Sequence, residues 1–227
     1  MDILVIDVGG TNIKLYHSSG AEWRRVPSGP TLTPGQMVAA VREATADWPH
    51  DVISIGYPGV IKEGRIVKEP ANLGPGWAGF DFAAAFNKPV RLINDAAMQA
   101  LGSYHGGRML FLGLGTGLGN ATVEDGRVTP LECGHLPYRK KQTFEQYIGA
   151  AGMEHLGDEL WEKHVHRIVR YLKDALVADY VVIGGGNSKR LKELPADSEL
   201  GSNSHAAEGG IALWRDVGAP SPPASPR

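Results

Sequence analysis

The chain has 227 residues, 42% of them hydrophobic and 21% charged, which is typical of a globular protein with one large domain or two small ones. The formal net charge of −2 argues against nucleic acid as a main partner, because no basic excess is present to neutralise phosphates. One cysteine, Cys133, excludes an internal disulfide and a cysteine-rich zinc site. No apolar run reaches membrane-spanning length and no basic signal region begins the chain, so we expect a cytoplasmic protein without a membrane partner.

The N-terminal segment predicts a buried strand followed by a glycine turn. Ile3–Val8 is a continuous apolar run with one acid, Asp7, as in a central strand. The turn exposes backbone N–H groups and one hydroxyl to a possible anion, and Lys14 follows closely enough to reach the same anion. An ordinary hairpin is the alternative, but a hairpin has no need of Asp7, whereas a metal-bound phosphate does. The turn residues are Gly9, Gly10 and Thr11.

The same order of elements occurs a second time in the middle of the chain. Strands are predicted over 109–114, 118–123 and 127–130, as they are over 3–8, 12–16 and 22–26 in the first segment. The second turn consists of Gly115, Thr116 and Gly117. This agreement suggests an internal duplication. We therefore expect two lobes of like topology, each offering a phosphate-binding turn to a shared cleft.

Between the two repeats, a carboxylate follows directly after a strand. Val90–Ile93 predicts a strand end, Asn94 and Asp95 come next, and a helix follows that is expected to close at Gly102. Helix capping is the alternative interpretation, since Asn and Asp are preferred capping residues. The two phosphate turns on either side in sequence favour a chemical role for Asp95.

Other segments predict supporting elements and further polar sites. Helices are expected over 33–48, 81–86, 143–148, 158–177 and 206–214, strands over 52–56 and 180–183, a hairpin arm over 61–67, and loop over 193–204. In the loop at 70–77, Asn72 suits a sugar hydroxyl and Trp77 is interpreted as a core anchor. Glu132 and His135 lie three residues apart and can converge on one ligand, although a structural histidine is the alternative. Three glycines allow a ligand to approach after the strand at 180–183: Gly184, Gly185 and Gly186.

Taken together, these motifs resemble the ROK family of sugar kinases, within the actin/hexokinase/Hsp70 superfamily. The resemblance lies in DVGGTNIK at 7–14, GYPGVI at 56–61, PANLGPGW at 70–77, NDAAMQALG at 94–102, GLGTGLG at 113–119, ECGH at 132–135 and GGG at 184–186. It implies an α/β fold of the two-lobed actin-like, ribonuclease-H-like ATPase type with a central cleft. The implied lobes are 1–105, joined by a returning helix at 206–216, and 106–205, with a disordered tail at 217–227.

The resemblance also implies roles for individual residues. Asp95 is the expected catalytic base that takes a proton from the sugar hydroxyl. Asp7 is expected to hold Mg²⁺, through water. The donor, ATP or polyphosphate, is expected at both glycine turns and at the GGG segment, with Lys189 beside it. The expected sugar-binding residues are Asn72, Asn94, Asp95, Glu132, His135 and Glu145.

The departures from the family pattern narrow the expected function. The cysteine-rich zinc loop that most members carry after ExGH is absent, so no structural zinc is expected. The family's usual glutamate after NDA…ALG is Ser103. The short GHLPYRKKQTFE and GGGNSKR segments resemble the polyphosphate glucokinase branch. We expect glucose phosphorylation with small-molecule substrates in a possible homodimer. The alternatives are an ATP-only hexokinase for fructose or an N-acetylhexosamine and a catalytically idle sugar-binding relative.

Two groups of cations are expected to assist a polyanionic donor. Arg139–Lys141 follows the ECGH motif closely, and Lys189–Lys192 follows the glycine run. Both groups could line the mouth of the cleft and bind a long polyphosphate, although a solvated surface is the alternative.

Overall fold

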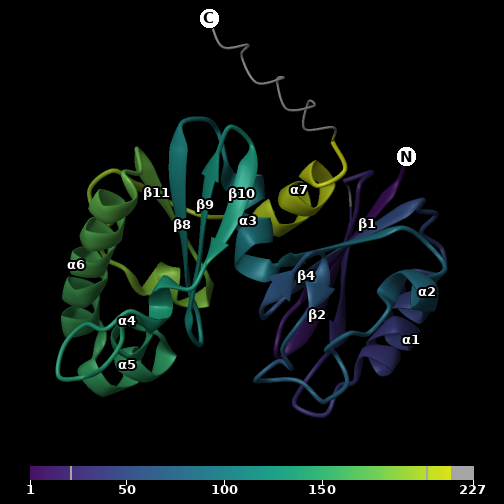
Figure 1. Ribbon diagram of the computed structural model, residues 1–227, viewed down its shortest axis with the longest axis horizontal. Coiled ribbons are helices and arrows are strands. Elements are labelled where there is room, and N and C mark those ends of the chain that lie inside the picture. The colour runs from purple at the N-terminus through teal and green to yellow at the C-terminus, as the bar shows by residue number, and fades with distance from the viewer. Residues whose placement is uncertain (21, 203, 216–227) are drawn as a thin grey trace, which may run out of the picture.

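The computed structural model describes residues 1–20, 22–202 and 204–215, and it contains two five-stranded sheets with the same strand order (Figure 1). The first sheet has the order β3-β2-β1-β4-β7 and the second the order β10-β9-β8-β11-β12. In each sheet, an antiparallel three-stranded meander is extended by two parallel strands. The repeated sequence pattern therefore corresponds to a repeated topology. The strands are β1 Ile3–Val8, β2 Asn12–His17, β3 Trp23–Pro27, β4 Val52–Tyr57, β7 Val90–Asn94, β8 Arg108–Leu114, β9 Leu118–Glu124, β10 Arg127–Leu131, β11 Tyr180–Gly184 and β12 Ser198–Leu200.

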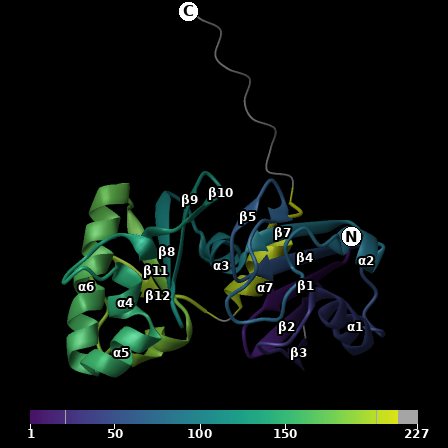
Figure 2. The ribbon, with the colours of Figure 1, turned by 60° about the horizontal axis from the view of Figure 1, so that its bottom comes forward.

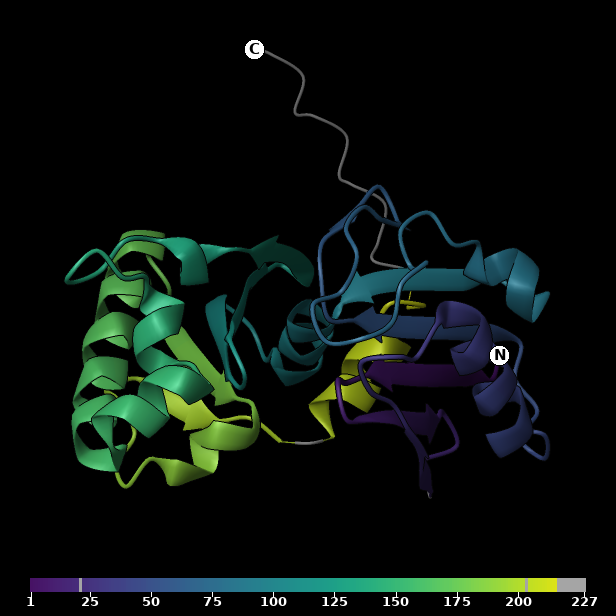
Figure 3. The same ribbon diagram turned by 90° about the horizontal axis from the view of Figure 1, so that it is seen from below.

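Helices cover the outer face of each sheet, as Figure 3 shows from below. In the first sheet, β1 and β4 are buried along their whole length, and their outer side chains pack with α1 (Pro34–Ala44) and α2 (Phe82–Phe86). The second sheet packs against α4 (Phe144–Ile148), α5 (Ala150–Leu156) and α6 (Asp158–Leu176). The apolar stripe expected on the longest helix is buried at Val165, Ile168, Val169 and Leu172, partly buried at Leu176 and 45% exposed at Leu160. Its remaining faces are mostly charged, as expected for an amphipathic surface helix.

Two helices lie between the sheets and join them (Figure 2). Helix α3 (Asp95–Ser103) contacts strands of both sheets, and α7 (His205–Ala212) packs along it. Small residues permit this close packing. A Cβ atom on Gly102 would overlap the His205 carbonyl oxygen, and one on Gly209 would overlap the Met98 carbonyl oxygen. The expectation that Gly102 closes the helix is therefore wrong, because α3 continues to Ser103 and Gly102 instead makes room for α7.

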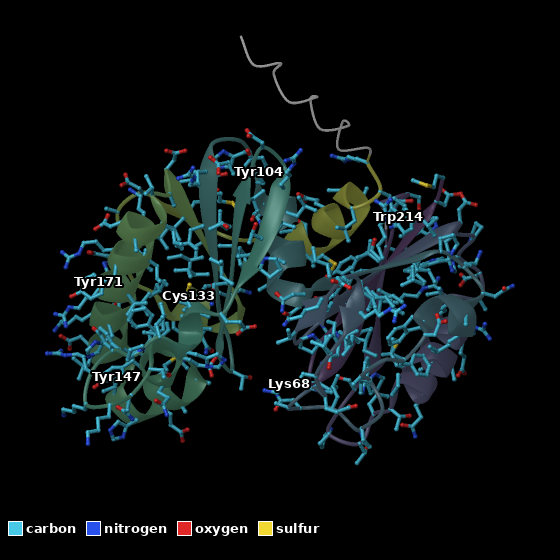
Figure 4. All side chains as sticks on the ribbon, viewed as in Figure 1. Lys68, Tyr104, Cys133, Tyr147, Tyr171 and Trp214 are labelled. Carbon is cyan, nitrogen blue, oxygen red and sulfur yellow. The ribbon has the colours of Figure 1, made fainter. Side chains whose placement is uncertain are left out.

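The returning helix is fastened to the first sheet at its C-terminal end. The Ser54 hydroxyl donates to the Gly210 carbonyl at 2.6 Å and accepts from the Trp214 indole N–H at 2.8 Å. Trp214 is labelled in Figure 4, near the C-terminal end of α7. The Arg91 guanidinium lies over its ring, 4.3 Å from the centroid. The first sheet is thus completed by residues that follow the second sheet in the chain.

Several elements differ from the sequence prediction. The segment at 193–204, expected as loop, contains the edge strand β12, and α5 was not predicted. Helix α1 ends at Ala44, earlier than expected, and α7 ends at Ala212. The predicted hairpin arm forms β5 (Ile61–Lys62) and β6 (Arg65–Ile66). The predicted tail lies outside the described residues, as does the end of the predicted 206–216 helix. Among the helices that the structure describes, none has both the length and the apolar character needed to cross a membrane.

Candidate active site

A cleft of about 350 Å³ lies where the two glycine turns face α3. Most of the residues expected at the site line it. From the donor prediction these are Gly9, Gly10, Gly115, Thr116, Gly117 and Gly185, and from the sugar prediction they are Asn72, Asn94, Asp95, Glu132 and Glu145. Other expected residues are absent from this lining: Asp7, Thr11, Lys14, His135, Gly184, Gly186 and Lys189. The roles assigned to all of these residues stay predictions.

Asp95 begins α3 at the cleft, and Asn94 is the helix cap. The Asn94 side-chain oxygen accepts from the Ala97 N–H at 3.0 Å, and its amide nitrogen donates to the Gly59 carbonyl at 3.2 Å. Capping by Asn94 leaves the neighbouring carboxylate available to the cleft. Desolvation by the surrounding protein, and then the nearby negative charge of Asp7, raise the pKa of Asp95 to about 7. A pKa close to neutrality suits a general base.

The first glycine turn is held by a serine that the sequence reasoning missed. The Ser28 hydroxyl donates to the Gly9 carbonyl at 2.6 Å, and the Ser28 N–H donates to the Thr11 carbonyl at 3.0 Å. Behind the turn, Asp7 and Lys14 face each other across β1 and β2, with their charged atoms 3.6 Å apart. Burial raises the pKa of Asp7, and Lys14 opposes that shift. Lys14, which is expected to bind a phosphate of the donor, therefore also pairs with a carboxylate.

The second glycine turn is anchored from three directions. The Gly115 carbonyl accepts from the Ala150 N–H and from the Asn187 side-chain amide, each at 3.0 Å. Just past the turn, the Leu118 N–H donates to Glu145 Oε2 at 3.0 Å. Within the described part of the chain, no acceptor takes the N–H groups of Thr116 and Gly117. A turn with fixed carbonyls and open N–H groups is suited to binding phosphate oxygens.

On the opposite side of the cleft, a clamped loop presents Asn72. The Glu69 carboxylate accepts from three backbone N–H groups of the loop at 3.0–3.1 Å, which lowers the pKa of Glu69. Trp77 is fully buried and donates from its indole to the Leu32 carbonyl, which confirms its prediction as a core anchor. Asn72 packs directly on the first turn, because a Cβ atom on Gly10 would lie 3.3 Å from the Asn72 Cβ.

The acid and the imidazole of the ECGH segment lie next to each other but face solvent. Glu132 Oε2 is 3.5 Å from His135 Nε2, and both side chains are more than 60% exposed. The alternative of a buried structural histidine is therefore wrong. Water competes for the hydrogen bonds of two side chains this exposed. A bound ligand, or a movement of the lobes, would have to exclude that water.

The expected cation groups do not line the described cleft. Lys140 instead lines a separate pocket of about 300 Å³ with Tyr147, His155 and neighbouring residues of α4 and α5. Figure 4 labels Tyr147 on the outer side of the second sheet, away from the first sheet. Arg190 pairs with Asp158 at 2.6 Å. These contacts favour the alternative interpretation of both groups as surface cations.

The donor atoms near the cleft fit a magnesium ion that is shared with a substrate. No group of three or more His, Cys, Asp or Glu side chains able to hold a metal occurs among the residues that the structure describes. Mg²⁺ in phosphoryl-transfer sites commonly uses one or two carboxylates, with water and substrate phosphates as its other ligands. Asp7 is near enough to the cleft for its charge to raise the pKa of Asp95, so its carboxylate fits this arrangement.

Three further polar residues at the site were missed, with different signals in the sequence. Gln99 lines the cleft one helical turn after Asp95, and this i, i+4 spacing could have identified it. Asn187 follows the expected GGG segment directly, but only its contact with Gly115 reveals its role. Asn120 is 2% exposed and lines the cleft from β9. In its strand it alternates with less polar residues, as Thr122 and Glu124 do, so the sequence pattern does not distinguish it from a solvent-facing residue.

Comparison with known proteins identifies a family and relatives for this chain. The model of the ROK family matches residues 3–149. Polyphosphate glucokinase of Mycobacterium leprae is 28% identical over 152 residues, which cover 61% of this chain and 47% of the relative, and fructokinase of Pediococcus pentosaceus is 31% identical over 155 residues, which cover 58% and 52%. The chain thus spans about half the length of these curated relatives.

A solved structure extends the comparison to nearly the whole fold. Inorganic polyphosphate/ATP-glucomannokinase from Arthrobacter sp. strain KM superposes with a TM-score of 0.79 at 25% identity, covering 93% of this chain and 97% of that one. The two sheets of matching topology, with a cleft at their glycine turns, are therefore an actin-like ATPase fold. Together with the match over residues 3–149, this shows that the chain belongs to the ROK family.

Proposed function

We propose that this protein is a sugar kinase that transfers a phosphoryl group from polyphosphate, ATP or both to a hexose, with glucose as the first candidate. The observation that supports this most is the position and pKa of Asp95. A carboxylate with a pKa of about 7 lies in one cleft with two glycine turns and with the amide and carboxylate side chains of Asn72 and Glu145. An acceptor hydroxyl and a phosphate chain would therefore meet beside a base.

In the proposed reaction, the sugar hydroxyl oxygen forms a bond to the terminal phosphorus while the bond from that phosphorus to the rest of the donor breaks. Asp95 takes the hydroxyl proton. Asn72, Glu132 and Glu145 orient the sugar, and the N–H groups of Thr116 and Gly117 bind phosphate oxygens. Phosphoryl transfer depends mainly on positioning and charge stabilisation, which these groups supply. Asp7 would hold Mg²⁺, through water, and the bound ion would neutralise charge on the phosphates.

The identity of the donor and the sugar can be tested in one set of assays. Purified protein is given glucose, mannose, fructose or N-acetylmannosamine with either ATP or polyphosphate, and sugar phosphate is measured. We expect glucose phosphorylation with at least one donor. A reaction driven by polyphosphate should weaken steeply as salt is added, because a donor with many charges binds with counterion release, while ATP-driven turnover should respond less. Failure of every sugar with both donors would refute the proposed kinase activity.

The two threonines of the glycine turns give a separate test of the donor site. Replacing Thr11 or Thr116 by Val keeps the side-chain shape but removes a hydroxyl. We expect the KM for the donor to rise by about tenfold, the effect of losing about 1.4 kcal/mol of binding, with sugar affinity largely kept. Steady-state kinetics with each substrate varied in turn would measure this. Loss of sugar affinity alone in both variants would contradict phosphate binding at these turns.

A further inference from the structure

One buried position differs in chemistry between the two topological repeats. Each glycine turn joins two antiparallel strands, and the paired residues of the two strands can be counted from the turn. The third pair is Ile6 with Leu15 in the first sheet and Leu112 with Asn120 in the second. Leu15 is fully buried and Asn120 is 2% exposed. An apolar side chain is therefore accepted at this place in the fold. Because a buried amide costs free energy unless it is hydrogen-bonded, the contacts of Asn120 explain its presence.

Asn120 joins the donor turn to the ECGH segment. Its amide nitrogen donates to the Leu118 carbonyl at 2.8 Å, and its side-chain oxygen accepts from the Cys133 N–H at 3.0 Å. Leu118 is the first residue after the turn at 115–117, and Cys133 follows Glu132 directly. One side chain thus connects a predicted phosphate-binding segment to a predicted sugar-binding segment.

Leu118 is also held from the sugar side through its other backbone group. Its N–H donates to Glu145 Oε2 at 3.0 Å. The surroundings leave little room for independent movement, since a Cβ atom on Gly117 would overlap that Glu145 oxygen and one on Gly134 would lie 3.2 Å from the Leu118 carbonyl oxygen. Both polar backbone groups of Leu118 are therefore fixed by side chains that belong to, or reach, the acceptor side of the cleft.

We propose that Asn120 is a positioning residue that couples sugar binding to the geometry of the second phosphate turn. This inference rests on the proposed sugar-kinase function. When a sugar contacts Glu132 and Glu145, it fixes the positions of their backbone segments. The hydrogen bonds of Asn120 and Glu145 to Leu118 then fix the position of the adjoining turn. Each ligand then raises the affinity for the other, as linkage requires. The coupling favours a productive donor geometry when an acceptor is present, which limits transfer to water.

The test is a binding cycle with Asn120→Leu, the residue type found at the matching place in the first repeat. The Kd of 6-deoxyglucose, which lacks the reacting hydroxyl, is measured by calorimetry with and without saturating tripolyphosphate, and again with AMPPNP. For the unaltered protein we expect affinity to rise at least about fivefold with one of these donors. In Asn120→Leu, we expect this ratio to fall below about twofold, while each Kd measured with a single ligand changes by less than about threefold.

A purely structural role for Asn120 would weaken both single-ligand affinities and leave their ratio unchanged, and that result would overturn the inference. Thr45→Val is the matched control, since Thr45 directly follows α1 on the outer face of the first sheet, is 3% exposed, and donates its hydroxyl to the Val41 carbonyl of that helix. It should keep the full coupling ratio. If Asn120→Leu does not fold, Asn120→Ala is measured in the same cycle with the same expectation. If the unaltered protein has kinase activity but no coupling between the two ligands, the role of Asn120 is overturned and the proposed function stands. If it neither binds sugar nor turns over, the proposed function is refuted as well.

Discussion

Asp95→Asn is expected to lower kcat for sugar phosphorylation by at least about 10²-fold while sugar affinity is largely kept. Asparagine has nearly the size of aspartate and can still accept the Ala96 N–H, which donates to Asp95 Oδ1 at 2.8 Å. It cannot take a proton from the attacking hydroxyl, and general bases commonly contribute 10²–10⁴-fold to a rate. Steady-state kinetics and sugar binding by calorimetry would measure the two effects separately.

The pH dependence of the unaltered protein checks the same assignment. Because the pKa of Asp95 is raised to about 7, the carboxylate is protonated below that pH and cannot act as a base. We therefore expect kcat/KM to fall as the pH decreases through about 7, by up to tenfold per pH unit, and this limb to be absent in Asp95→Asn. Near-normal turnover in the variant, or an unchanged acid limb, would rule out Asp95 as the base.

Gly209→Ala is expected to cause a large loss of stability, because Gly209 lies in the close contact between the two helices that separate the sheets. The new Cβ atom would overlap the Met98 carbonyl oxygen and lie 3.0 Å from the Gly102 nitrogen. Both are backbone atoms of α3, so the helices must separate. We expect a loss of about 3 kcal/mol in the free energy of unfolding, which lowers the Tm by roughly 6–12 °C in a chain of this size.

The matched control for this substitution is Gly35→Ala in α1. An added Cβ atom at Gly35 meets no atom within 4 Å, and alanine has the higher helix propensity. The Tm of this variant should be unchanged or slightly raised, as measured by calorimetry or circular dichroism. A Tm for Gly209→Ala within about 1 °C of the unaltered protein would contradict the close packing of α3 and α7.

The sequence patterns predicted those parts of the fold that depend on local periodicity. Ile3–Val8 and Met109–Leu114 are apolar runs bounded by glycine turns, and both are buried central strands. Strand β12 was missed because Ser198–Leu200 is short and polar, and forms only through pairing with β11. Helix α5 was missed because only Gly149 separates Ala150–Leu156 from the end of α4, and no side chain caps it.

The site was predicted where a motif placed a polar residue next to a turn or strand end. Asp95, Asn72 and Glu145 line the cleft, although their roles remain to be tested. Ser28 and Asn187 were not predicted because the side chain of each donates to a carbonyl oxygen of a turn that is distant in sequence. Such contacts depend on tertiary structure, which a single sequence does not reveal. The exposure of Glu132 and His135 could likewise not be read from their spacing.

The return of α7 to the first sheet affects how the chain folds during synthesis. Gly210 lies against Val5, and Ala206 shares a core with Ile3 and Val52, so the part of this face that α3 does not cover stays open until α7 leaves the ribosome. At typical elongation rates of about 5–20 residues per second, that delay after the first sheet emerges is roughly 5–20 s. An apolar face exposed for that time is a binding site for a chaperone and a hazard for aggregation on the nascent chain. The second sheet, whose covering helices α4, α5 and α6 all precede its fourth strand, has no comparable wait.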